Sequence, residues 1–221
     1  MRFAIVGDIR IEAQPNQQGI CPNCSQSVIA KCGKQKIWHW AHRNITSCDN
    51  WWESETEWHR NWKNNYPLEW QEIQMIDRET GEKHISDVRT IHNLTIEFQH
   101  SVIKPDERIS REKFYKNMIW VVDGTRLERD YIRFNKGLSY FRSTRKKGFY
   151  FVDFPGEVFP KNWLNSEFPV IFDFCGLSTT EQDKIKNILW CLLPKKDSPE
   201  TIVMGLIKKD FVEKTRNNGR F

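Results

Sequence analysis

The segment from residue 20 to residue 48 constrains the fold of this chain most strongly, because it is poor in aliphatic side chains and rich in soft metal ligands. It holds a CxxC motif followed by further cysteines and histidines, at Cys21, Cys24, Cys32, His39, His42 and Cys48. A CxxC knuckle directs two thiolates at one ion, and structural zinc takes four sulfur or nitrogen ligands. A short segment with little apolar core needs a cross-link of this kind.

Beside Cys21 and Cys24, two pairs of residues are candidates for the remaining two ligands: His39 with His42, or His42 with Cys48. If the chain is extended from residue 37 to residue 42, His39 and His42 point to opposite faces, which disfavours using both. We therefore expect Cys21, Cys24, His42 and Cys48 to bind one structural zinc ion, with His39 as the alternate ligand. The alternative is that these cysteines are buried as small apolar thiols.

A helix is predicted from Trp51 to Tyr66, where Pro67 ends it, and Ser54 with Glu57 fits a capping box. On a helical wheel, three tryptophans form a buried stripe. Three titratable side chains follow beside that stripe at a spacing of four residues: Glu55, His59 and Lys63. They are either an exposed face with helix pairing or one edge of a functional site.

Strand patterns follow at 68–77, 83–91 and 94–101, and they bring Asp87 and Glu97 onto consecutive strands. Glu97 and Gln99 share one face of their strand. Two carboxylates flanked by apolar residues are costly to bury unless a cation lies between them. Mg²⁺ is such a cation, and it can activate water toward a phosphodiester. The alternative is two exposed carboxylates on a solvated sheet face.

Further along the chain, a helix is predicted around 110–117 and an apolar strand at 118–122. Strands are expected near 148–154 and 169–174, and helices near 180–193 and 199–214. The chain therefore has the pattern of a mixed α/β (α+β) protein.

Taken in order over roughly residues 20–135, the motifs resemble the competence-protein CoiA-like nucleases. The resemblance is carried by CPNC at 21–24, HWAH at 39–42, ETEWH at 55–59, ISDV at 85–88, IEFQHS at 96–101, REKFY at 111–115 and IWVV at 119–122. It implies a PD-(D/E)XK (restriction-endonuclease-like) core behind an N-terminal zinc-binding β module. The implied domains are 1–50 for the zinc module, 51–135 for the nuclease core and 136–221 for a C-terminal α+β extension.

The resemblance also implies roles for individual residues in a nuclease that uses Mg²⁺ or Mn²⁺. Asp87 and Glu97 would hold this ion with the Phe98 carbonyl, and His59 would complete the site or position a water. Gln99 stands where the family pattern usually has lysine, so either the enzyme works with an amide or Lys63 supplies the missing cation. Glu55 and Lys63 are expected to support the site. The implied activity is hydrolysis of phosphodiester bonds in DNA during competence, recombination or defence; the alternative is a catalytically inactive zinc-containing DNA-binding accessory protein.

A basic stretch at 126–147 is the candidate nucleic-acid surface, since cations bind phosphates and interleaved aromatics can stack on bases. Arg145, Lys146 and Lys147 are its predicted phosphate contacts; the alternative is a solvated turn. The net charge of +5 permits a nucleic-acid partner without requiring one. The sequence contains no long apolar run and no signal-peptide pattern, so we expect a cytoplasmic protein without a membrane span, with reduced cysteines.

Overall fold

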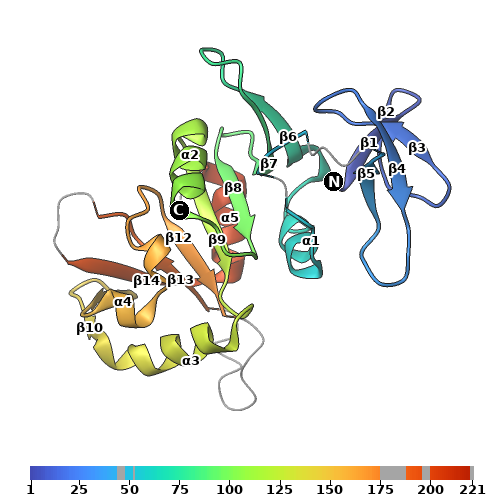
Figure 1. Ribbon diagram of the computed structural model, residues 1–221. Coiled ribbons are helices and arrows are strands. Elements are labelled where there is room, and N and C mark those ends of the chain that lie inside the picture. Colours follow the sequence, from blue (N-terminus) through green and yellow to red (C-terminus); the bar gives the residue numbers. More distant parts are fainter. Residues whose placement is uncertain (44–47, 52, 175–187, 196–199, 220–221) are drawn as a thin grey trace. The chain divides into compact units, whose positions relative to one another are not determined.

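The computed structural model describes the chain apart from residues 44–47, 52, 175–187, 196–199 and 220–221 (Figure 1). It is a mixed α/β protein with two sheets, which confirms the predicted class at that level. The chain divides into two compact units, Met1–Arg89 and Thr90–Phe221. The predicted boundaries after residues 50 and 135 and the PD-(D/E)XK core stay predictions. No described helix has the length and hydrophobicity needed to cross a membrane.

The first unit begins with an antiparallel sheet in the order β2-β1-β3-β4-β5. Its strands are β1 (Phe3–Val6), β2 (Ile9–Glu12), β3 (Gln18–Ile20), β4 (Ser27–Lys31) and β5 (His39–His42). Gly7 and Asp8 join β1 to β2, and both have positive φ, at 53° and 67°. Tight two-residue hairpin turns favour this conformation, and glycine adopts it without steric cost. Strands β1 and β2 therefore form a tight antiparallel hairpin.

The interior of this sheet is small. One core cluster of buried hydrophobic side chains in it comprises Met1, Ala4, Ala13, Cys21, Val28 and Trp40. Trp40 is the one large aromatic among them, and its Nε1 donates to the Ile11 carbonyl at 3.2 Å. A core of this size contributes limited hydrophobic stabilisation, which agrees with the expectation that the segment needs a cross-link.

The rest of the first unit consists of α1 (Glu57–Lys63), a 3₁₀ turn (Leu68–Trp70) and the antiparallel strands β6 (Gln71–Ile76) and β7 (Lys83–Arg89). The helix is shorter than predicted, because Thr56 is the N-cap and its side chain accepts from the His59 amide. Ser54 and Glu55 therefore precede the helix. Trp51 is not part of a helical stripe either; its ring stacks on His84 of β7, with centroids 3.2 Å apart.

The second unit is built on a sheet in which β8-β9-β12 form a parallel set and the strands beyond it run antiparallel. The strand order is β10-β11-β14-β13-β12-β9-β8. The strands are β8 (Thr95–Gln99), β9 (Met118–Asp123), β10 (Phe141–Ser143), β11 (Phe149–Val152), β12 (Val170–Asp173), β13 (Ile188–Leu192) and β14 (Thr201–Ile207). The helices are α2 (Pro105–Tyr115), α3 (Glu128–Gly137), α4 (Pro155–Val158) and α5 (Lys208–Asn218), with 3₁₀ turns at Leu138–Tyr140 and Lys161–Trp163.

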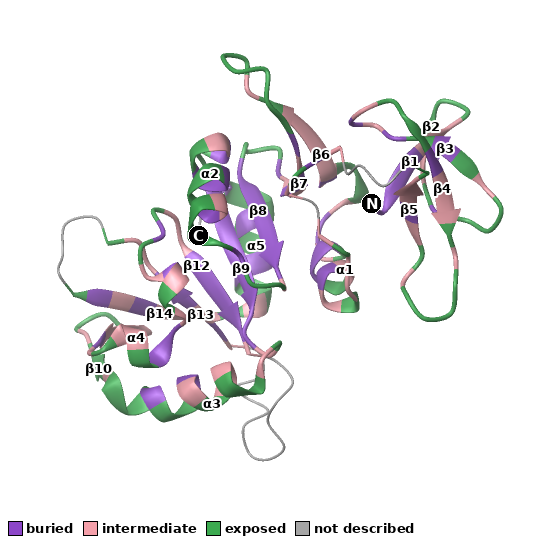
Figure 2. Ribbon diagram, in the orientation of Figure 1, coloured by how far each residue is buried: buried purple, intermediate pink, exposed green. Residues whose placement is uncertain are grey.

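All residues of β8, β9 and β12 are buried (Figure 2). Strands covered on both faces have near-continuous apolar sequences, as β9 does with MIWVVD. Aromatic rings pack around this sheet. Phe134 of α3 stacks on Phe174 at 4.1 Å, and Phe159 stacks on Phe172 of β12 at 4.9 Å. The second unit thus has a large aromatic core.

Of two C-terminal helix predictions, the first is wrong where the structure describes it, and the second is wrong only over β14. The helix predicted at 180–193 falls partly outside the described residues, and its described end is strand β13. The helix predicted at 199–214 is divided between strand β14 and helix α5. In both places an apolar run pairs with neighbouring strands of the sheet, and this tertiary environment overrides the local helical pattern.

Candidate functional site

The CxxC knuckle lies in the connection between β3 and β4. The Cys21 amide donates to the Gln26 carbonyl at 2.8 Å, and the Ser25 amide donates to the Cys21 carbonyl at 2.9 Å. Ser25 has a φ of 60°, which closes the turn. The Asn23 amide points back at the Cys21 sulfur at 3.4 Å. These contacts hold both cysteine side chains on one side of the turn.

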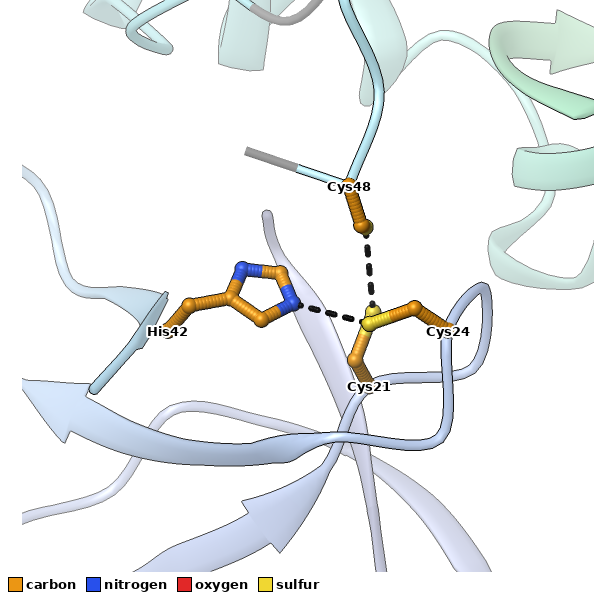
Figure 3. A group of neighbouring side chains, drawn as sticks. All are labelled: Cys21, Cys24, His42 and Cys48. Atoms are coloured by element: carbon orange, nitrogen blue, oxygen red, sulfur yellow. Dashed lines mark hydrogen bonds between the residues drawn. The ribbon is translucent and has the colours of Figure 1, made fainter. Parts of the chain in front are cut away.

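Cys21, Cys24, His42 and Cys48 form one group, and their ligand atoms all lie within 4.8 Å of one another (Figure 3). The Cys24 sulfur lies 3.2 Å from Nε2 of His42, and the sulfurs of Cys21 and Cys48 lie 3.7 Å apart. Two sulfurs bound to one tetrahedral zinc are separated by about 3.8 Å. The group fits a metal ion such as zinc, and it is the ligand set that the sequence favours.

His39 is absent from this group among the described residues. It begins β5 and His42 ends it, so the two side chains lie on opposite faces of the strand. The Nδ1 of His39 instead faces the Ile37 carbonyl at 2.9 Å.

Asp49 anchors the segment that carries Cys48. Its carboxylate accepts from the Ile85 amide, and Nδ1 of His84 lies 2.8 Å from its Oδ1. These bonds lower the pKa of Asp49 although its burial acts in the opposite direction. Because Asp49 and Trp51 both contact β7, the fourth ligand is fixed through the β6–β7 hairpin.

The metal-free thiols are held in their neutral form. Burial raises the pKa of Cys48 to about 12, and it raises that of Cys21 as well. Burial also lowers the pKa of His42, which keeps its imidazole neutral and able to bind a metal. Crowded thiolates need a cation beside them, so metal binding at this site would displace the thiol protons.

Lys63 forms the second cluster of the first unit. Its side chain is 3% exposed, and Nζ lies 2.7 Å from Glu55, 3.0 Å from Glu72 and 3.9 Å from Asp87. Burial lowers the pKa of Lys63, but Glu72, Glu55 and Asp87 outweigh it and raise the pKa overall. A buried ammonium ion therefore stays charged next to Asp87.

Glu72 was not predicted. Burial raises its pKa, but the charge of Lys63 and further partners hold it at about 2. The Glu72 carboxylate also accepts from the Arg2 amide at 2.8 Å and the Phe3 amide at 3.2 Å. Its φ is 47°, which is strained for a non-glycine residue inside a strand. In a strand with alternating polar and apolar residues, a carboxylate is expected to face solvent. The local sequence therefore does not indicate that Glu72 pairs with Lys63.

His59 and Glu55 lie at the start of α1. His59 is buried, and its Nδ1 lies 3.1 Å from the Thr56 hydroxyl. Glu55 accepts from Arg60 as well as from Lys63. Burial raises the pKa of Glu55, but the Arg60 hydrogen bond and the Lys63 charge lower it overall. The predicted grouping of Glu55 with Lys63 is present, although Glu55 precedes the helix.

In the second unit, β8 presents Glu97 and Gln99 on one face, and Phe98 lies between them. Glu97 is 3% exposed and accepts from Nη1 of Arg111 in α2 at 3.2 Å. Burial lowers the pKa of Arg111, and Glu97 and Glu107 raise it overall. Gln99 donates to the carbonyl and hydroxyl of Ser101 at 3.1 and 3.2 Å. Arg111 is a second residue that sequence reasoning missed as a partner of the site.

Arg145, Lys146 and Lys147 lie in the turn between β10 and β11, and all are exposed. Gly148 has a φ of 83°, which permits the turn. Arg142, in contrast, is bound bidentately by Asp153. Of the interleaved aromatics, Phe134 is buried in the core and Tyr140 is 37% exposed.

Residues 9–50 match the family profile described as competence protein CoiA, N-terminal domain. This range covers strands β2 to β5 and the knuckle of the first sheet, but not β1, and contains all four members of the Cys3His group. No curated protein and no solved structure shows significant similarity to the chain. This match supports a CoiA-like family assignment through residues 9–50.

Proposed function

We propose that the chain is a metal-dependent nuclease that hydrolyses phosphodiester bonds in DNA. Asp87 and Glu97 would hold Mg²⁺ or Mn²⁺ together with the Phe98 carbonyl. When bound, that ion supplies activation of a water molecule and compensation of the charge that develops on phosphate. Oxygen donors of this kind are the ones that Mg²⁺ prefers.

The observation that carries this proposal is the position of Lys63. Its Nζ lies 3.9 Å from Asp87, and Glu55 and Glu72 fix it there. A fixed positive charge stabilises a developing oxyanion better than an amide does, because the amide has no net charge. The position of Lys63 thus supports the interpretation that its ammonium group supplies the positive charge that the family's usual lysine would carry at the position of Gln99.

The surroundings of Glu97 support a charged carboxylate. Buried acids are protonated unless a partner compensates them, and Arg111 is such a partner. An ionised Glu97 is a metal ligand and a protonated one is not. His59 would position water from α1, Gln99 would orient the nucleophile, and Glu55 would hold Lys63 in place.

A DNA-binding protein without catalysis is the second candidate. The exposed turn at Arg145, Lys146 and Lys147 favours it, because phosphate contacts require exposed cations and no metal. The Gln99 side-chain amide is also bound to Ser101, which gives it a structural role in the absence of substrate.

Asp87→Asn separates the two candidates. The change keeps the size of the side chain and removes the charge that holds the metal, so Mg²⁺- or Mn²⁺-dependent cleavage of single- and double-stranded DNA should fall by about three orders of magnitude or more. Binding of DNA without divalent ions should be retained. Gln99→Lys tests directly whether the amide limits the rate.

Asp8→Asn is the matched control, since Asp8 is exposed in the β1–β2 turn and asparagine tolerates its positive φ. Absence of cleavage in the wild type, with an unchanged Asp87→Asn variant, would refute the nuclease. Replacing Arg145, Lys146 and Lys147 by alanine should then still weaken binding and reduce the salt slope by about one unit for each lost phosphate contact.

A further inference from the structure

A cavity of about 250 Å³ with charged and apolar walls lies wholly within the second unit. It is bordered by the end of β8, the end of β9, the start of α3 and the 3₁₀ turn at Lys161–Trp163. No residue assigned above to metal binding or catalysis lines it, and neither do the predicted phosphate contacts Arg145, Lys146 and Lys147; Arg126, Arg129 and Arg133 of its lining belong to the basic stretch 126–147. The cavity therefore needs an explanation of its own.

Positive charge dominates its lining. Arg126, Arg129, Arg133 and Lys161 face Asp123 and Asp130. Both carboxylates are already engaged: Asp130 accepts from Arg133 at 3.0 Å, and Asp123 is bound by His100 and Thr125. Among the residues that the structure describes, no carboxylate forms an ion pair with Arg126, Arg129 or Lys161. The cavity thus has cationic groups without matching anions.

Two further features favour an anion. The Nε of Arg133 is buried and has no hydrogen-bond acceptor in the described part of the chain. Buried donors are normally satisfied, so this atom marks a missing acceptor. The ten-residue helix α3 also begins at the cavity, with Leu127 as an N-cap that offers no side-chain acceptor. The amides of a first helical turn and its dipole favour a negative charge.

We infer that this cavity binds a phosphate monoester. Guanidinium groups present planar pairs of donors that match phosphate oxygens, and a dianion balances the excess charge of the lining. Apolar walls at Val102, Val122 and Trp163 leave room for the group that carries the phosphate. The ligand is either the terminal phosphate of a nucleic-acid strand or a free nucleotide. The inference is independent of the proposed nuclease, because it requires neither a metal ion nor cleavage.

The test measures binding of the full chain to an internally labelled oligonucleotide of one sequence, in a buffer that contains neither divalent ions nor a chelator. The oligonucleotide is prepared in three forms, with a 5′-phosphate, with a 3′-phosphate, or with hydroxyl groups at both ends. Adenosine monophosphate serves as the competitor. We expect one phosphorylated end to bind at least about tenfold more tightly than the hydroxyl form. Arg126→Gln combined with Lys161→Gln should abolish this preference, and both side chains are exposed, so the fold should remain intact.

Lys136→Gln is the control, because Lys136 is exposed on the same helix and does not line the cavity. A preference for a phosphorylated end that persists in this control and disappears in the double variant supports a strand end as the ligand. Competition by adenosine monophosphate without any end preference, again lost only in the double variant, supports a free nucleotide. The inference is overturned if neither effect is present, if the double variant keeps the effect, or if Lys136→Gln loses it equally.

Discussion

The two units fill their interiors with different chemistry. In the first, the small core of the N-terminal sheet lies beside a Cys3His group, and a lysine is buried among carboxylates. In the second, fully buried strands are packed with aromatic rings. Hydrophobic packing is non-directional and tolerates small changes, whereas buried charges and metal ligands depend on every partner being present. The first unit should therefore be destabilised by removal of single charged or metal-binding side chains. The second should be destabilised by substitutions that reduce the volume of its core side chains.

Removal of a zinc ion bound by the Cys3His group should produce the largest effect. Structural zinc sites contribute of the order of 10 kcal/mol to folding, so chelation should unfold the N-terminal sheet while the second unit stays protected. Hydrogen exchange, measured separately for peptides of each unit, and elemental analysis for about one zinc per chain would check this expectation. A metal-free protein with native protection in β1 to β5 would contradict it.

Cys21→Ser should act in the same way, and Cys191→Ser is its matched control. Both cysteines are fully buried, so the two changes place the same hydroxyl in a protein interior. Only Cys21 belongs to the Cys3His group. Equal loss of stability in both variants would show that burial of the hydroxyl, and not metal binding, decides the outcome.

Phe159→Ala should have the next largest effect, in the second unit. Phe159 is fully buried between Phe134 and Phe172, and such truncations cost about 3–5 kcal/mol. Amide hydrogen exchange should become faster in β9 and β12, while the zinc content stays unchanged. Phe154→Ala is the control, since that ring is 68% exposed, and it should change stability by less than about 0.5 kcal/mol. Loss of zinc from Phe159→Ala would contradict the separation of the two units.

Acid should have a smaller effect, and it should act on the charged cluster of the first unit. The pKa of Glu72 is about 2, below its ordinary 4.5. The lowered pKa stabilises the folded state fully above pH 4.5, and this contribution, about 3 kcal/mol, is lost as the pH falls from 4.5 through 2. Stability measured against pH in Glu72→Gln should lack this component. Glu69→Gln, at an exposed position on the neighbouring turn, should retain it.

Local pattern predicted the parts of this molecule that local physics determines. Strands β6 to β9 follow from alternation and apolar runs, and the favoured ligand set follows from the CxxC spacing and the alternation of side chains along β5. The start of α1 was misplaced because Ser54 and Thr56 can both cap a helix. In the structure Thr56 caps it, and the Trp51 ring stacks on His84 outside the helix. The roles of Glu72 and Arg111 depend on Lys63 and Glu97, which are distant from them in the sequence and come close only in the folded chain.

The parallel pairing of β9 also has a consequence for the order of events during folding. Its apolar strand receives β12 as a neighbour, and Trp120 pairs with Val170, fifty residues further along the chain. Closing so long a loop is slow. During synthesis, one edge of β9 therefore stays unpaired until β12 has left the ribosome. An unpaired apolar edge is a template for intermolecular strand pairing. We therefore expect the protein to refold best at high dilution, with aggregation arising from the unpaired edge of the buried strand β9.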